Sequence, residues 1–150
     1  MAFMGTMEKP CNDILVYSLE YELIERIKLD SLIMISSMTL SPDEKYLICA
    51  HLQIKVTIIN TTDFKVITDS PFGDQSFSVW RVAVTNSGRI IFATSDGLYT
   101  GRITEDGEFD GENHLHEGCN VERAQVVIGE FVMCAVKESE SSKLILIDLD

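Results

Sequence analysis

The chain has 150 residues, of which 45% are hydrophobic and 24% are charged, and its formal net charge is −12. That composition fits one globular domain, and the acidic balance disfavours nucleic acid and anionic membranes as partners. No apolar run approaches the roughly 20 residues that a membrane helix needs. The N-terminus does not resemble a secretory signal, so we expect a cytoplasmic protein.

The first part of the chain divides into a tail and an incomplete structural unit. Residues 1–11 are predicted to form an N-terminal tail, and residues 12–29 to form a partial unit of strands. The segment EYELIERIK has residue types that favour helices. It nevertheless occupies the place of an outer strand in the later units, so we predict a strand there.

A fuller unit follows at residues 33–70. Its segment MTLSPDEKYLICAH, residues 38–51, has a short apolar start, a polar turn and a dense apolar run. Pro42 stands at the second position of a predicted type I turn. The run YLICA does not alternate between polar and apolar residues, which predicts a strand buried on both faces.

The same pattern recurs along the rest of the chain. In the unit 77–117, VAVTNSGRIIFATS aligns with the earlier segment at an offset of 44 residues, and its Asn and Gly residues favour a turn. The partial unit 121–150 contains a third copy, AQVVIGEFVMCAV. The second halves of the four units align at Ser18, Asn60, Arg102 and Asp148, at intervals of 42, 42 and 46 residues.

About four short strands per repeat of this length predict an all-β protein with the architecture of a β-propeller. Residues 12–150 would form about three to four blades, each a four-stranded antiparallel sheet. Because the chain stops on a strand, we interpret it as a fragment of a longer propeller. Two alternatives stay open: the ends pair to complete one blade, or several chains associate.

The repeats resemble those of the WD-repeat and YVTN-like propeller families. LSPDEKYLICAHLQIKVTIINTTDFKVI and SGRIIFATSDGLYTGRI carry this resemblance, which extends over residues 12–150. In WD repeats a Trp-Asp pair ends the third strand and a Gly-His pair precedes the first. Here only Asp148 fits the first feature, and no Gly-His pair occurs.

One acidic stretch, EDGEFDGENHLHE, approaches the spacing of a twelve-residue calcium loop. The matching residues are Asp106, Glu108, Asp110, Gly111 and Glu117. Glu at the third position and Asn113 at the eighth depart from the pattern, and no helix is predicted on either side. We favour a solvated outer hairpin with two turns.

The remaining metal-binding and nucleophilic residue types favour structural roles. His114, His116 and Cys119 have no evident fourth zinc ligand, so a surface loop is favoured. Cys49 and Cys134 lie in apolar runs and are interpreted as buried thiols. We predict no catalytic residue, no cofactor and no metal site.

Trp80 and Arg81 are the candidate interaction surface, with Phe77 nearby, since Trp and Arg are frequent interface anchors. Packing of Trp80 between blades is the alternative.

The favoured function is a non-catalytic scaffold for protein partners, including proteins with basic surfaces, the rest of a longer propeller or a second copy. The resemblance leaves a second hypothesis, a lactonase-like hydrolase whose metal site is completed by residues outside this chain. Few acids lie near inner-strand ends, namely Asp43, Glu44 and Glu130.

Overall fold

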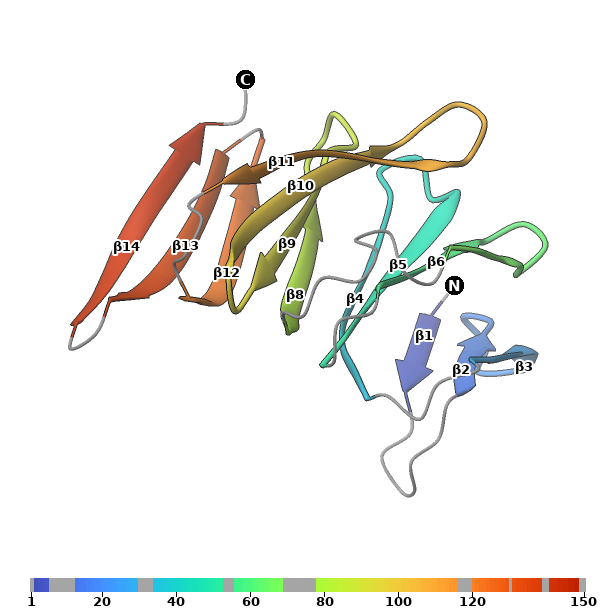
Figure 1. Cartoon of the computed structure of the whole chain (residues 1–150). Coiled ribbons are helices and arrows are strands. Elements are labelled where there is room, and N and C mark those ends of the chain that lie inside the picture. The colour runs from blue at the N-terminus through green and yellow to red at the C-terminus, as the bar shows by residue number, and fades with distance from the viewer. Residues whose placement is uncertain are drawn as a thin grey trace. The chain divides into compact units, whose positions relative to one another are not determined.

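The computed structural model describes residues 2–5, 13–29, 34–52, 56–68, 78–115, 120–129, 131–138 and 141–148. All the regular elements in these ranges are β-strands, as Figure 1 shows. They belong to two compact units, Met1–Ile35 and Ser36–Asp150. Within the described ranges there is no helix long and apolar enough to cross a membrane.

The first unit is a three-stranded antiparallel sheet in the order β1-β2-β3. Its strands are β1 (Ala2–Gly5), β2 (Asp13–Tyr17) and β3 (Leu23–Lys28). The strand predicted in EYELIERIK is therefore present as β3. The predicted tail differs from the structure, because its residues 2–5 form β1 and pair with β2. Four residues are too short to show a strand period, so this pairing has no signal in the sequence.

The second unit contains three antiparallel sheets, which lie side by side in chain order in Figure 1. The first has the order β4-β5-β6-β7, with strands Ile35–Leu40, Tyr46–His51, Val56–Asn60 and Val66–Thr68. The second has the order β11-β10-β9-β8, with β8 Val79–Val84, β9 Ile90–Thr94, β10 Gly97–Ile103 and β11 Phe109–Leu115. The third has the order β12-β13-β14, with strands Asn120–Ile128, Phe131–Glu138 and Ser141–Asp148.

The core of the second unit lies between neighbouring sheets, and β9 shows how this arises. Alternate residues of a strand point to opposite faces of its sheet. On β9, Ile90 and Phe92 join a cluster with residues of β5, β6, β8 and β10. Ile91 and Ala93 join a second cluster with residues of β12, β13 and β14. The middle sheet is thus buried on both faces, as its unbroken apolar runs predict.

The inner strands of adjacent sheets also contact each other. The Ser36 hydroxyl on β4 lies 3.1 Å from the Ala50 carbonyl oxygen and 3.0 Å from that of Val79, on the next sheet. β8 in turn lies against β12. The all-β prediction, with four-stranded antiparallel sheets, is confirmed.

One turn geometry recurs at the ends of the hairpins. A Ser or Thr carbonyl accepts a hydrogen bond from the amide three residues on, and that residue has a positive φ. The four turns begin at Ser18, Ser41, Thr85 and Thr104, and their positive-φ residues are Tyr21, Glu44, Gly88 and Gly107. In each turn the hydroxyl of the first residue accepts a hydrogen bond from a later amide. A type I turn followed by a left-handed residue fits the twist of a hairpin.

Candidate functional site

The predicted interaction residues Trp80 and Arg81 lie on β8. The pairing of β8 with β9 shifts register between Val79 and Arg81, which makes Trp80 the bulged residue. Arg81 is exposed and Trp80 is half-buried. The Trp80 Nε1 atom is buried, with no hydrogen-bond partner among the described residues. Phe77 lies outside the described residues, so the surface that these three residues would form stays a prediction.

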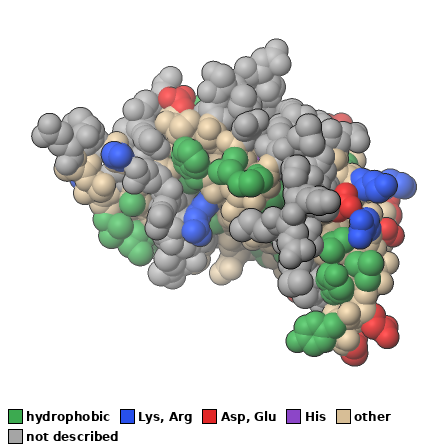
Figure 2. Space-filling model, turned by 90° about the horizontal axis from the view of Figure 1, so that it is seen from below, with side chains coloured by type: hydrophobic (Ala, Val, Ile, Leu, Met, Phe, Trp, Pro, Cys, Tyr) green, Lys and Arg blue, Asp and Glu red, His purple; other side chains and the backbone are tan. Residues whose placement is uncertain are grey.

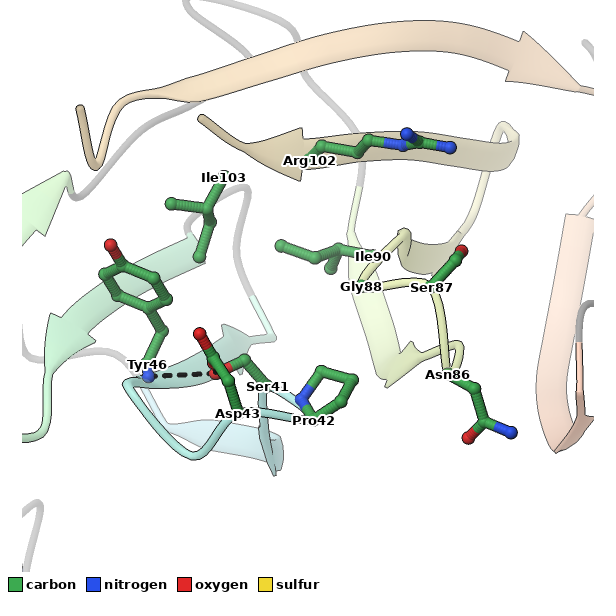
Figure 3. A pocket seen from close by; sticks show the side chains of 10 residues that line it. All are labelled: Ser41, Pro42, Asp43, Tyr46, Asn86, Ser87, Gly88, Ile90, Arg102 and Ile103. Carbon is green, nitrogen blue, oxygen red and sulfur yellow. Dashed lines mark hydrogen bonds between the residues drawn. The ribbon is translucent and has the colours of Figure 1, made fainter. Parts of the chain in front are cut away.

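A pocket of about 380 Å³ lies where the first two sheets of the second unit meet. Its lining comes from the β4–β5 turn, the β8–β9 turn and the end of β10, as Figure 3 shows. The lining residues are Ser41, Pro42, Asp43, Tyr46, Asn86, Ser87, Gly88, Ile90, Arg102 and Ile103. Because adjacent blades repeat the same fold, equivalent turns meet at one edge.

On one side of the pocket, the Ser41 turn is held by its own polar groups. The Ser41 hydroxyl donates to Asp43 Oδ1 at 2.6 Å and accepts from the Tyr46 amide at 3.0 Å. The Lys45 amide also donates to Asp43 Oδ1, at 3.2 Å. The Ser41 hydroxyl therefore stabilises the turn both as a hydrogen-bond donor and as a hydrogen-bond acceptor.

The carboxylate of Asp43 is stabilised in its charged form. Its pKa lies below the ordinary value, chiefly because the Ser41 hydroxyl donates to it, with the Lys45 amide and ammonium adding to the effect. Lys45 Nζ lies 3.3 Å from Asp43 Oδ2. This ion pair is exposed, so its contribution to the free energy of unfolding is small.

The opposite side of the pocket is the β8–β9 turn of the next sheet. Thr85 is fully buried, and its hydroxyl oxygen accepts from the Arg89 amide at 3.1 Å and lies 2.9 Å from that of Ser87. Gly88 has a φ of 84°. Asn86 is exposed at the rim of the pocket. This side, like the first, is a rigid turn that displays polar side chains.

The base of the pocket is apolar. The side chains of Tyr46, Ile90 and Ile103 point toward its interior in Figure 3. Tyr46 and Ile103 also pack against the cluster between the first two sheets, to which Ile90 belongs. An apolar base with a polar rim is the usual composition of a site that binds a side chain or small molecule.

The acidic stretch forms a hairpin over its described part. Thr104 and Glu108 pair across the turn, and Gly107 has a φ of 83°. Phe109–Leu115 is then the extended strand β11, paired with β10. A calcium loop wraps around its ion, whereas this backbone is extended. Glu117 lies outside the described residues.

The other candidate ligands do not converge in the described part of the chain, where no group of three His, Cys, Asp or Glu is placed to hold a metal. The side chain of His114 and the residues His116, Cys119 and Glu130 are not described. Cys49 and Cys134 are buried free thiols, as predicted. Burial raises the pKa of both thiols, that of Cys49 to about 12.

Sequence reasoning missed the pocket. The turns SPDE and NSGR were each predicted, at equivalent positions of repeats 44 residues apart. Equivalent turns of consecutive blades lie on the same edge of the propeller. The repeat offset is therefore the signal from which the proximity of Asp43 and Asn86 could have been predicted.

No protein-family model matches this chain, and no curated protein is similar to it in sequence. Solved structures are similar in fold. The chain is 12% identical to the dihydro-heme d1 dehydrogenase NirN, with a TM-score of 0.72, over 98% of this chain and 35% of that one. It is 13% identical to the Pan2 WD40 domain of Neurospora crassa, with a TM-score of 0.62, over 91% and 41%.

A third similar structure is the Cps50 (Swd1) β-propeller domain of Myceliophteria thermophila, 10% identical, with a TM-score of 0.59, over 78% of this chain and 38% of that one. These likenesses define the class of fold: the chain has the β-propeller fold, similar to WD40 domains. The chain spans less than half the length of each of these three proteins.

Proposed function

We propose that this chain is a non-catalytic scaffold that binds another protein at the pocket between its β4–β5 and β8–β9 turns. The observation that carries the proposal is the construction of this pocket. Two turns, each held by its own hydroxyl, stand on adjacent sheets around an apolar base. Preorganised turns lose little conformational entropy when a partner binds.

The lining suggests which side chain a partner would insert. Ile90 and Ile103 offer apolar contact, and the polar part of the lining includes the Asp43 carboxylate, the Asn86 amide and the Arg102 guanidinium. An inserted side chain with an apolar stem and a polar end, such as Lys, Arg or Tyr, matches this arrangement. A basic group is also favoured by the net charge of −12, which steers cationic partners toward the protein.

The proposal is tested with a photo-crosslinking amino acid at Asn86, in cells that express the protein. Asn86 is exposed at the rim of the pocket. Glu25, exposed on β3 of the first unit, is the control position. We expect a discrete crosslinked protein from Asn86 that Glu25 does not give. No product at Asn86, or the same product from both positions, would contradict the proposal.

The hydrolase hypothesis needs a separate test. A panel of lactones is incubated with the purified chain, with and without a chelator. We expect no turnover above the buffer rate. Turnover that the chelator abolishes would favour the metal-dependent hydrolase over the scaffold.

A further inference from the structure

The turn between β2 and β3 carries large apolar side chains in an exposed position. Leu19 is 75% exposed, Tyr21 is 87% exposed, and Leu23, at the start of β3, is 51% exposed. They alternate with Glu20 and Glu22, which are exposed as well. We call these five residues, all of the first compact unit, the hairpin tip. Figure 2 shows exposed hydrophobic side chains with acidic side chains close to them on the surface of the molecule.

Three other turns with the same hydrogen-bonding pattern show what a solvated turn of this kind contains. They begin at Ser41, Thr85 and Thr104. At the position of Leu19 they have Pro, Asn and Glu, and at the position of Tyr21 they have Glu, Gly and Gly. Among the four turns, only the hairpin tip has a large apolar side chain at either position. The turn geometry itself therefore does not require these residues.

Tyr21 also adopts a backbone conformation that is unfavourable for its residue type. Its φ is 65°, and the equivalent residues of two other turns are Gly88 and Gly107. A positive φ is rare for a bulky residue, because the Cβ crowds the backbone. Phe64 has a similar φ of 57° but is half-buried, whereas the Tyr21 ring is nearly all exposed. Strain at an exposed side chain indicates that the side chain has a use outside the fold.

Ser18 holds the hairpin tip in one conformation. Its carbonyl oxygen accepts a hydrogen bond from the Tyr21 amide at 3.2 Å, and its amide donates to the Glu22 carbonyl at 2.8 Å. Its hydroxyl oxygen accepts from the amides of Glu20 and Glu22, at 3.2 and 3.1 Å. None of these four bonds uses the side chain of Leu19, Tyr21 or a glutamate. The tip is thus preorganised, and its side chains are left for contact with a partner.

The composition of the tip defines the partner that fits it. A Tyr ring is a frequent interface anchor, because it buries a large apolar area and brings a hydroxyl group. Neither Glu20 nor Glu22 forms an ion pair with a described residue. Two carboxylates beside apolar anchors match an apolar pocket with Lys or Arg at its rim. A second copy of this chain, with a net charge of −12, and an anionic membrane do not match by charge.

We propose that the hairpin tip inserts Tyr21 and Leu19 into an apolar pocket, rimmed by Lys or Arg, on another protein. The tip lies on a different compact unit from the β4–β5/β8–β9 pocket, so this binding does not depend on the function proposed above. Glu25 follows closely on β3. Any crosslinked product from Glu25 should therefore match the product from Glu20 and differ from the product at Asn86.

The test begins with a photo-crosslinking amino acid at Glu20 of the full chain, in cells that express the protein. Asp106 occupies the equivalent position of the turn that begins at Thr104 and is the matched control. We expect a discrete product from Glu20 that Asp106 does not give. The captured protein is identified by mass spectrometry and purified, and its Kd for the full chain is measured by calorimetry. The Kd should rise between about 0.05 and 0.5 M salt, because salt screens exposed charges.

Variants of the full chain then separate binding from folding. Tyr21→Gly is expected to raise the Kd at least tenfold, because it removes the anchor. It should not lower the melting temperature, since glycine relieves the positive φ. Glu20→Lys/Glu22→Lys should also raise the Kd at least tenfold, through repulsion by the basic rim. Asp106→Lys/Glu108→Lys makes the same change of charge in the equivalent turn and should leave the Kd unchanged.

Several results would overturn the proposal. One is the absence of a product from Glu20, or the same product from Asp106. Another is a Kd that Tyr21→Gly, charge reversal at the tip or salt leaves unchanged. Nitration of the purified chain with tetranitromethane tests whether the chain itself covers the tip. Tyr21 should react much faster than Tyr99, which is 9% exposed, and equal rates would also overturn the proposal.

Discussion

The ring of Phe109 lies over Gly101 and fills the space that a side chain at Gly101 would need. Gly101 is on β10 at the point where the register with β11 shifts. Phe109 also meets Phe92 edge to face, with ring centroids 5.9 Å apart and planes at 70°. This contact links β11 to the apolar cluster between the first two sheets of the second unit, next to the base of the pocket.

Gly101→Ala is expected to lower the free energy of unfolding by about 1–3 kcal/mol, the usual cost of overpacking a core. A Cβ there would meet both the Phe109 ring and the Asp110 carbonyl. Urea denaturation of the variant measures the loss. When Phe109→Leu is already present, Gly101→Ala should cost less free energy of unfolding than it does in the wild-type chain. If Gly101→Ala costs the same in both backgrounds, the Phe109 ring is not the cause of the loss.

Glu44→Gly is expected to raise the free energy of unfolding by up to about 1 kcal/mol, because a left-handed conformation is strained for any residue with a Cβ. Glu44 has a φ of 58°, and Gly88 has the same role in the next sheet. Thermal denaturation measures the change. Lys45→Gly is the matched control, since Lys45 is not among the residues of positive φ. A gain from both variants would contradict the explanation.

The ionisation of Asp43 should make a small part of the stability depend on pH. Its folded pKa lies below the ordinary 3.8, so the contribution is present above pH 3.8 and is lost as the pH falls through the lowered value. A carbon-detected NMR titration measures this pKa. In Ser41→Ala we expect it to rise toward 3.8, because the hydroxyl is the largest cause. If the pKa of Asp43 is unchanged in Ser41→Ala, the lowering of this pKa is due to Lys45 and not to the hydroxyl.

Cys49 is expected to resist iodoacetamide at pH 8 in the folded protein and to react once the chain is denatured. Burial removes the thiol from solvent and raises its pKa to about 12, so almost no thiolate forms. Peptide mass mapping after timed labelling measures the modified fraction of Cys49. Labelling of Cys49 at the same rate in the native and the denatured protein would show that this strand opens readily.

The sheets were predictable because their signal is long and repeated. The runs YLICA and IIFA are apolar without alternation, and β5 and β9 are buried on both faces. The positions of Pro42 and Gly88 in their turns follow from local backbone preferences. These features depend on residues close together in the sequence, which is why they can be read from it.

The rest depends on contacts between distant residues. Strand β1 exists because it pairs with β2, and the bulge at Trp80 exists because β8 and β9 differ in local length. Neither has a sequence period of its own. The pocket needs the stacking of two sheets, which the repeat offset implies but no single motif encodes.

Among the described residues of the second unit, the Ser36 hydroxyl lies near the carbonyl of Val79 on the next sheet, and each of the two apolar clusters joins a pair of neighbouring sheets. Evolution can therefore lengthen or shorten such a protein by duplicating or deleting one stretch of about 44 residues. Only the one junction that receives the new piece must be remade, and every older junction keeps its residues. The residues at the junctions should accordingly change together in pairs across neighbouring repeats, while the turns vary independently.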